Sequence, residues 1–396
     1  MIEISERIKA IPPYIFAQID EAKAAAAERG IDIIDLGIGD PDIPTPTAIV
    51  DEMAKAIRKP ENHNYPPYQG TPAFRQSVAR WYKSRFNVDL DPNSEVLSLI
   101  GSKEGIAHAC LSYLDAGDVA LLPDPGYPAY QVGVLIAGGE PVLVPVTEEN
   151  GYMPDLEAID AATLEKARII FLNFPGNPTG AVASDEFFKS AIAWAKKHNI
   201  LIAMDLAYSE VYYDNEKPKS ILEFEGGKDV AIEFHTLSKT FNMTGWRVGM
   251  AVGNQTAIQT LGKIKTNMDS GVFKAIQDTA IYALDHYEDF IPEQNKLFQE
   301  RRDIVVEGLT RCGWDITPPK ASYYIWTHIP SNYSSAQKFA IDLLEETGIL
   351  VVPGTGYGER GEGYFRISIT TPTDRLREAM KRLETHNVRF RETATA

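Results

Sequence analysis

Short apolar runs alternate with helical patterns through the middle of the chain, and this alternation most restricts the possible folds. The runs cover residues 96–100, 119–122, 142–146, 169–172, 200–204, 232–235 and 248–252. Several are rich in β-branched residues and lack a period of two, as expected for strands buried on both faces of a mostly parallel sheet. Helical patterns near 103–114, 127–136, 185–198 and 255–265 supply the crossovers. We predict a three-layer α/β/α domain with a mostly parallel sheet.

The pattern changes near residue 285. Helical stretches at 292–311, 335–347 and 373–385 accompany strand-like runs at 349–352 and 365–369, which indicates a smaller α+β domain. The N-terminal part carries a helix at 20–29, a strand that breaks into a Gly/Pro turn at 33–41, and a helix near 47–58. A chain of 396 residues exceeds one ordinary hydrophobic core. We therefore predict a large domain at 48–285 and a second unit that combines 1–47 with 286–396, with a disordered tail at 391–396.

Charge and composition exclude several classes of function. The net charge of −16 argues against binding a nucleic-acid backbone. Cys110 and Cys312 lie outside any Cys-x-x-Cys spacing, so we expect no disulfide framework and a reducing compartment. The first seven residues hold acids and no apolar core, and no apolar run approaches the length of a membrane span. The seven histidines are scattered singly, so we expect no metal site, and we expect a cytoplasmic protein without a membrane partner.

The strongest local motif is residues 235–249. Lys239 lies just past the apolar run 232–235, at the kind of strand end where α/β sheets place ligands. The hydroxyls of Thr236 and Ser238 can donate to a phosphate, and the planar fork of Arg247 matches two phosphate oxygens. This suits a phosphate-bearing cofactor that forms an imine with the lysine. Taken alone, a surface lysine in a polar loop explains the motif equally well.

Polar residues also follow the neighbouring predicted strands. Asn177 lies in the turn after the run 169–172, and Ser102 opens a helix whose backbone amides suit a phosphate. Asp205 ends the run 200–204, where a carboxylate can keep a ring nitrogen protonated, and Tyr208 follows three residues later. Each of these is individually explained as a turn, a loop or a cap. Their occurrence at successive strand ends of one sheet indicates a single site.

The order of these motifs resembles the signature of class I/II aminotransferases of fold type I. The resemblance spans nearly the whole chain and also rests on Tyr65, Gly70, Tyr127 and Arg366. The segments 11–16, 35–46 and 265–271 are similar to LL-diaminopimelate aminotransferases of the short bacterial type.

This resemblance implies pyridoxal 5′-phosphate (PLP) as cofactor. Lys239 would form the imine with PLP and then move a proton between the substrate Cα and the cofactor. Asp205 would hold the ring nitrogen protonated, and Asn177 and Tyr208 would hydrogen-bond the ring's phenolic oxygen. Tyr127 would stack on the ring face.

The resemblance also assigns the phosphate and substrate groups. Ser102, Lys103 (through its backbone), Thr236, Ser238 and Arg247 would hold the phosphate. Tyr65 would reach in from a neighbouring subunit, which implies a homodimer. Arg366 would clamp the substrate α-carboxylate, while Tyr14 and Gly39 close over the substrate.

We therefore predict a PLP-dependent aminotransferase acting on small amino and keto acids. The preferred reaction joins glutamate and tetrahydrodipicolinate to give LL-diaminopimelate, on the route to lysine. Alternatives are an aspartate, alanine or aromatic aminotransferase, and a PLP-dependent C–S lyase of the same fold. The PLP-binding module of a regulator is disfavoured because 1–47 is too short and acidic for a DNA-binding domain. For the run 323–326 we weigh a place in the cleft against ordinary packing, and packing is the preferred interpretation. The glycines at 37–39 and 354–358 are interpreted as loop turns rather than a dinucleotide fingerprint.

Overall fold

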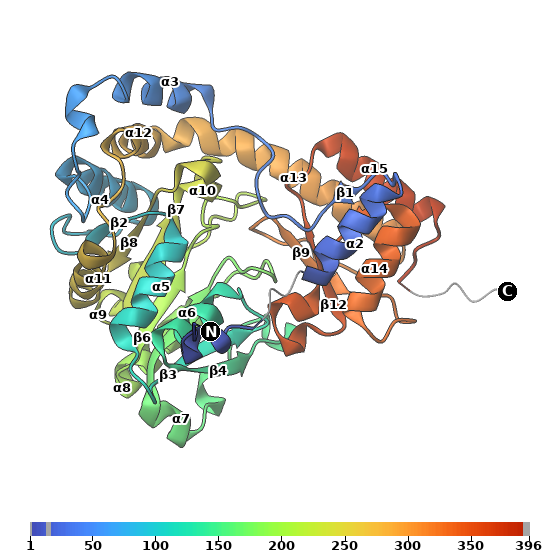
Figure 1. Cartoon of the computed structure of the whole chain (residues 1–396), viewed down its shortest axis with the longest axis horizontal. Helices are drawn as coiled ribbons and strands as arrows, with labels where there is room; N and C mark the ends of the chain where they lie inside the picture. Colours follow the sequence, from blue (N-terminus) through green and yellow to red (C-terminus); the bar gives the residue numbers. More distant parts are fainter. Residues whose placement is uncertain (1, 13–16, 391–396) are drawn as a thin grey trace.

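The computed structural model describes residues 2–12 and 17–390 of the chain. Tyr14 and the tail 391–396, for which the sequence predicts substrate closure and disorder, lie outside the described residues. Figure 1 shows a larger body around a central sheet and a smaller body beside it, with the long helix α13 (Tyr287–Arg311) passing between them. No helix in the described ranges combines the length and apolarity needed to cross a bilayer.

The central sheet has seven strands, and most of them are parallel. In spatial order they are β2 (Val96–Leu99), β8 (Gly249–Gly253), β7 (Ala231–Thr236), β6 (Leu201–Asp205), β5 (Ala167–Asn173), β3 (Val119–Asp124) and β4 (Glu140–Pro145). Of these seven, β8 alone is antiparallel to its neighbours, β2 and β7. Each of these strands begins and ends within two residues of a run read from the sequence. The predicted three-layer fold with a mostly parallel sheet is confirmed.

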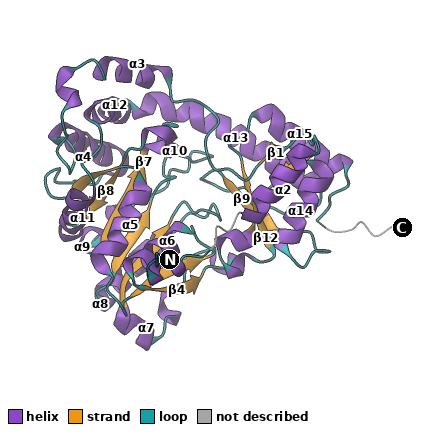
Figure 2. Ribbon diagram, viewed as in Figure 1, coloured by secondary structure: helices purple, strands orange, loops and turns teal. Residues whose placement is uncertain are grey.

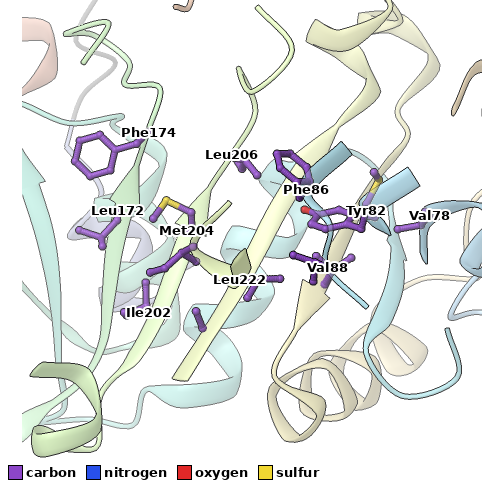
Figure 3. Close-up of a cluster of buried hydrophobic side chains, with 14 of the residues drawn as sticks. Val78, Tyr82, Phe86, Val88, Leu172, Phe174, Ile202, Met204, Leu206 and Leu222 are labelled. Atoms are coloured by element: carbon purple, nitrogen blue, oxygen red, sulfur yellow. The ribbon is translucent and has the colours of Figure 1, made fainter. Parts of the chain in front are cut away.

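Helices cover both faces of this sheet (Figure 2). Ile169 and Phe171 of β5 belong to a core shared with α5 (Ser102–Tyr113), α6 (Ala129–Ala137) and α11 (Gln255–Met268). Ile170 and Leu172 belong to the opposite core, with α3 (Thr47–Ala56), α4 (Pro72–Phe86), α8 (Asp185–His198) and α12 (Lys274–Asp285). Figure 3 shows part of this second core. Because successive residues of a strand point to opposite faces, burial on both sides makes the strands continuously apolar.

The smaller body combines both ends of the chain. Strands β11 (Val352–Pro353), β12 (Tyr364–Ser368) and β9 (Tyr324–His328) form an antiparallel sheet in that order. Helices α14 (Ala336–Thr347) and α15 (Thr373–Thr385) share a core with it. Near the N-terminus, β1 (Ile34–Asp35) pairs in parallel with β10 (Ile349–Leu350), and α2 (Ala17–Glu28) packs on α14.

Some elements differ from the sequence prediction. The predicted strand 349–352 is two short strands, because β10 pairs with β1 while β11 pairs with β12. Helix α13 begins at Tyr287 rather than at Pro292, with Glu288 and Asp289 in its first turn, where acids interact favourably with the helix dipole. The described ranges also contain the short helices α1 (Glu6–Lys9), α7 (Ala161–Lys166), α9 (Gly227–Val230) and α10 (Leu237–Thr240).

A buried ion pair fastens α4 to the segment that follows β6. Arg85 Nε donates to both carboxylate oxygens of Glu210, at 3.0 and 3.1 Å, and both side chains are almost completely buried. The same guanidinium donates through Nη2 to the carbonyl oxygens of Pro218 (3.0 Å) and Ser209 (3.4 Å). Arg85 therefore holds the chain directly after Tyr208 against the large body.

We expect Arg85→Met to lower the free energy of unfolding by about 3–5 kcal/mol, because it leaves the Glu210 carboxylate buried without its cation. Urea unfolding of the cofactor-free protein measures this loss. Arg80→Met is the matched control on the same helix: Arg80 pairs with Asp285 at the surface, so we expect a change below about 1 kcal/mol. Equal losses in the two variants would contradict the assignment.

Candidate active site

The carboxyl ends of the central strands bring the candidate residues together. β5, β6 and β7 are parallel neighbours that end at Asn173, Asp205 and Thr236. Each end is followed three or four residues later by a further polar side chain: Asn177, Tyr208 and Lys239. Because β2 and β7 are both antiparallel to β8, β2 also ends at this edge, and β8 begins there just after Arg247.

A cleft of about 800 Å³ opens at this edge. Its lining contains most of the residues predicted from the sequence: Gly39, Ser102, Lys103, Tyr127, Asn177, Asp205, Tyr208, Thr236, Ser238, Lys239, Arg247 and Arg366. Tyr65 does not line it and is 83% exposed, so its side chain is not placed in the cleft of its own chain.

Lys239 lies in the short helix α10 and carries a buried amine. Its Nζ donates to the carbonyl oxygen of Gly39 at 2.6 Å. Burial lowers the pKa of Lys239, and the nearby guanidinium groups of Arg366 and Arg247 lower it further against the opposing effects of Tyr324 and Asp40. A lysine in these surroundings loses its proton more readily than one in water, which a nucleophile or base requires.

Asp205 ends β6 as a buried carboxylate. Its Oδ2 accepts from the Tyr130 hydroxyl at 2.8 Å, and its Oδ1 accepts from the backbone N–H of Ala207 at 3.3 Å. Burial raises the pKa of Asp205 to about 6, although both hydrogen bonds act in the opposite direction. Among the described residues it has no ion-pair partner. A buried carboxylate without a cation is costly, so this site suits a ligand that brings a protonated nitrogen.

Arg247 and the first turn of α5 form an anion cradle. Arg247 Nη1 lies 3.4 Å from Ser238 Oγ, and its Nη2 lies 3.4 Å from the carbonyl oxygen of Ile100. Gly101 precedes α5 with a φ of 80°, and a Cβ on it would collide with the Arg247 guanidinium. Thr236 donates to Ser238 at 3.0 Å, so hydroxyls, a guanidinium and helix N-terminal amides converge here. This combination suits a phosphate.

Arg366 projects from β12 of the smaller body. Its Nη1 donates to Asn177 Oδ1 at 2.8 Å, and its guanidinium lies 4.0 Å from the ring centroid of Tyr324. Its Nε is buried and has no hydrogen-bond partner in the described part of the chain. An arginine held over an aromatic ring, with a buried N–H that has no partner among the described residues, is suited to a carboxylate.

The turn after β1 contributes three successive carbonyl oxygens. That of Gly37 accepts from Arg366 Nη2 at 2.5 Å, and that of Ile38 accepts from the Thr370 hydroxyl at 2.7 Å. The carbonyl of Gly39 accepts from Lys239, as described above. Asp35 shapes this turn, because its Oδ1 accepts from the backbone N–H of Gly37 at 2.9 Å. The turn therefore contacts two of the basic side chains of the cleft, Arg366 and Lys239.

Three residues of the site were missed by sequence reasoning. The Tyr130 hydroxyl donates to the Asp205 carboxylate, and the side-chain amide of Asn173 donates to the carbonyl oxygen of Asp205 at 2.8 Å. For Tyr324 the sequence favours packing over a place in the cleft, but the residue lines the cleft and its hydroxyl lies 2.8 Å from that of Tyr208. Tyr324 stands opposite Ser368, two residues from Arg366, so the period of two places Tyr324 and Arg366 on the same face of the sheet.

Comparison with known proteins identifies the family. The model of the family "Aminotransferase class I and II" matches residues 31–383. The chain belongs to this family. It is therefore a PLP-dependent transaminase of fold type I, which acts on amino and keto acids.

Similar proteins cover essentially the whole aminotransferase chain. LL-diaminopimelate aminotransferase from Aquifex aeolicus is 52% identical over 384 residues, which is 97% of this chain and 99% of that protein. LL-diaminopimelate aminotransferase from Halothermothrix orenii is 51% identical and covers 98% of this chain and 100% of its own length. Among solved structures, substrate-bound BacF from Bacillus subtilis superposes with a TM-score of 0.92 at 37% identity, covering 98% of this chain and 99% of that one.

We expect the stability of the cofactor-free aminotransferase to depend on pH because Asp205 is buried. Because the pKa of Asp205 is raised to about 6 from 3.8, the folded cofactor-free protein keeps a proton that the unfolded chain releases. Stability therefore falls as pH rises between these values. Asp205→Asn removes this loss, so we expect the cofactor-free variant to be more stable than the parent above pH 6, by about 2–3 kcal/mol, with little gain near pH 4.

Thermal unfolding of both cofactor-free proteins across this pH range measures the difference. A gain that does not change with pH would contradict the proposed cause. Added PLP should stabilise the parent more than Asp205→Asn, because the variant no longer offers an anion to the ring nitrogen.

Proposed function

We propose that this aminotransferase exchanges the amino group between LL-diaminopimelate and 2-oxoglutarate. The observation that carries the proposal is the full-length similarity, above 50% identity, to two proteins of that name. The cleft agrees with a dibasic, dicarboxylic substrate, because its lining holds ionisable side chains of both signs besides the cofactor groups: Asp20, Lys23, Asp35, Asp40 and Lys103. A substrate with an ammonium and a carboxylate at its far end needs both signs.

The cleft residues fit PLP as cofactor. When bound, PLP supplies an electron sink for the electron pair left at the substrate Cα. Asp205, a buried carboxylate without a cation among the described residues, would hold the ring nitrogen protonated. Tyr208 and the amide NH₂ of Asn177 would donate to the phenolic oxygen, and Tyr127, on the cleft wall, would cover the ring face.

Phosphate and carboxylate would be held at separate places. Arg247, Ser238, Thr236 and the first-turn amides at Ser102 and Lys103 would bind the phosphate. Arg366 would hold the α-carboxylate of the substrate in two parallel hydrogen bonds, with Gly39 and Tyr14 closing over it. Fixing the carboxylate orients the Cα–H bond toward Lys239.

Lys239 would be the proton carrier of the reaction. Its amine would bind the cofactor covalently between turnovers, and when released it would remove the proton from Cα and return it on the cofactor side. The lowered pKa of Lys239 favours the neutral amine that this role needs. Arg366 and Arg247 assist by their positive charge, so the groups that bind ligand also tune the base.

We further propose a homodimer with shared active sites. Tyr65 is exposed and absent from the cleft of its own chain, so a second copy is needed for its hydroxyl to reach a phosphate. Exposed apolar side chains on neighbouring stretches, Val50, Ile57, Tyr68 and Met268, support burial of this surface by a partner. We also propose that 48–285 and 1–47 with 286–396 are two domains, supported by the pairing of β1 with β10 and their shared core.

Amino-donor assays test the substrate assignment. With 2-oxoglutarate as acceptor, we expect LL-diaminopimelate to give glutamate at a kcat/KM at least ~100-fold above that with L-aspartate, because only the longer substrate reaches the distal charges. Strong turnover of aspartate, alanine or an aromatic amino acid, with none of LL-diaminopimelate, would reject it. Pyruvate and ammonia released from cystathionine without a keto acid would instead indicate a C–S lyase.

Hybrid dimers test the shared site. Lys239→Met and Tyr65→Ala homodimers should each be strongly impaired. Refolding the two variants together at equal amounts should restore about one quarter of the parent activity, because half of the dimers are hybrids and each hybrid holds one intact site. If Tyr65 served its own chain, no hybrid would contain an intact site and mixing would restore nothing.

A further inference from the structure

A buried charge cluster lies behind the anion cradle, outside the cleft. Lys265 of α11 is completely buried, and its Nζ donates to Glu104 Oε1 at 2.8 Å. The same Nζ donates to both carboxylate oxygens of Asp269, at 3.0 and 2.9 Å. Neither Lys265 nor its two acids is among the residues that line the cleft. The reaction derived above does not use them.

Glu104 connects this cluster to the cradle. It lies in the first turn of α5, and its Oε2 accepts from the backbone N–H of Ile100. The carbonyl oxygen of the same Ile100 faces Arg247 Nη2, and Gly101 packs against that guanidinium. The position of the Glu104 carboxylate therefore fixes the turn on which the cradle is built.

Asp269 connects the cluster to the loop that carries Tyr65. Its Oδ1 accepts from the backbone N–H of Gly271 at 2.6 Å. Gly271 has a φ of 86° and lies against the 66–68 backbone: a Cβ on it would stand 3.1 Å from Pro66 Cγ and 3.3 Å from the carbonyl oxygen of Pro67. Such a contact leaves little room for the turn at 269–271 to move without the Tyr65 loop.

We propose that Lys265 is a positioning residue for the cofactor phosphate, joining the cradle of its own chain through Glu104 to the Tyr65 loop through Asp269. The proposal goes beyond the substrate assignment and rests only on the phosphate cradle. In the proposed dimer, Lys265 links the phosphate site of its own chain to Tyr65 of the same chain, which would serve the active site of the other subunit.

The physical reason for a lysine here is charge compensation. Burial raises the pKa of Glu104 to about 7, the Asp269 side chain acts in the same direction, and contact with Lys265 opposes both. Without this cation the acid would hold its proton more tightly still. The other groups that face Glu104 are Asp269 and, at 3.7 Å, His108 Nδ1; burial lowers the pKa of His108, which therefore stays neutral. Leu99 and Phe234, from β2 and β7, present apolar side chains to this turn of α5. Lys265 thus favours the ionised form of Glu104 and balances its negative charge behind the phosphate cradle.

A double-mutant comparison tests this. Lys265→Met keeps the side-chain length and removes the charge, which leaves two acids sharing one proton. We expect the dissociation constant of PLP, measured by titrating cofactor-free protein, to rise at least tenfold at pH 8 and less at pH 6.5, where the shared proton is retained. When Lys265→Met is combined with Glu104→Gln, the new amide oxygen can still accept from Ile100 and its NH₂ can donate to Asp269. We therefore expect the double variant to bind PLP within threefold of the parent at both pH values.

Two further measurements separate positioning from general damage. Lys263→Met, an exposed position on the same helix, should leave PLP affinity unchanged. Hydrogen exchange should accelerate in residues 65–72 and 266–273 of Lys265→Met and return to the parent rate in the double variant. At saturating PLP, the KM of the amino donor should change less than twofold, because Arg366 lies in the other body.

The proposal is overturned if Lys265→Met binds PLP like the parent, or if the double variant is no better than the single. It is also overturned if the affinity loss is independent of pH. If Lys265→Met does not fold, the double variant decides alone, and a tenfold loss of PLP affinity in it refutes the proposal. The substrate assignment is untouched by either result, because PLP binding is measured without substrate.

Discussion

The parallel register of β5, β6 and β7 is the constraint on which the site depends. Strands that run in the same direction end at the same edge, and Asn173 stands directly opposite Asp205 in the ladder. After each strand the chain turns away from the sheet, and these turns place Asn177, Tyr208 and Lys239 around one cleft. A ladder slipped by one residue would turn each of these ends to the opposite face. The apolar cores on both sides of the sheet therefore fix the chemistry as well as the fold.

The site is built from charges that are poorly compensated without ligand. Asp205 is a buried anion with no ion-pair partner among the described residues, Lys239 is a buried amine, and Arg366 keeps a buried N–H unused. Each costs stability in the empty protein, and each has its counterpart on a ligand: a ring nitrogen, an aldehyde carbon and a carboxylate. By comparison, the buried cations Arg85 and Lys265 are paired within the chain, with Glu210 and with two acids respectively.

Much of the fold could be read from the sequence, because doubly buried strands leave apolar runs that are bounded by turns. The runs 169–172 and 200–204 gave the ends of β5 and β6 to within two residues, and with them Asp205 and the Asn177 turn. Contacts between distant segments could not be read. The sequence favours packing for Tyr324 over a place in the cleft, and only the pairing of β9 with β12 puts it beside Arg366. Likewise, nothing local in the segment around Lys265 indicates that it meets Glu104, 161 positions away.

The turn formed by Gly37, Ile38 and Gly39 affects how cofactor and substrate bind in the cleft. Two of its carbonyl oxygens accept from Arg366 and Lys239, the groups that would hold the substrate carboxylate and the cofactor. If Lys239 Nζ bonds covalently to the cofactor, it has fewer protons to donate to Gly39. Likewise, a carboxylate bound to the Arg366 guanidinium uses N–H groups that could otherwise donate to Gly37. A ligand that binds Arg366 or Lys239 therefore competes with the turn for their N–H groups. Ligand binding and the conformation of this turn are therefore coupled.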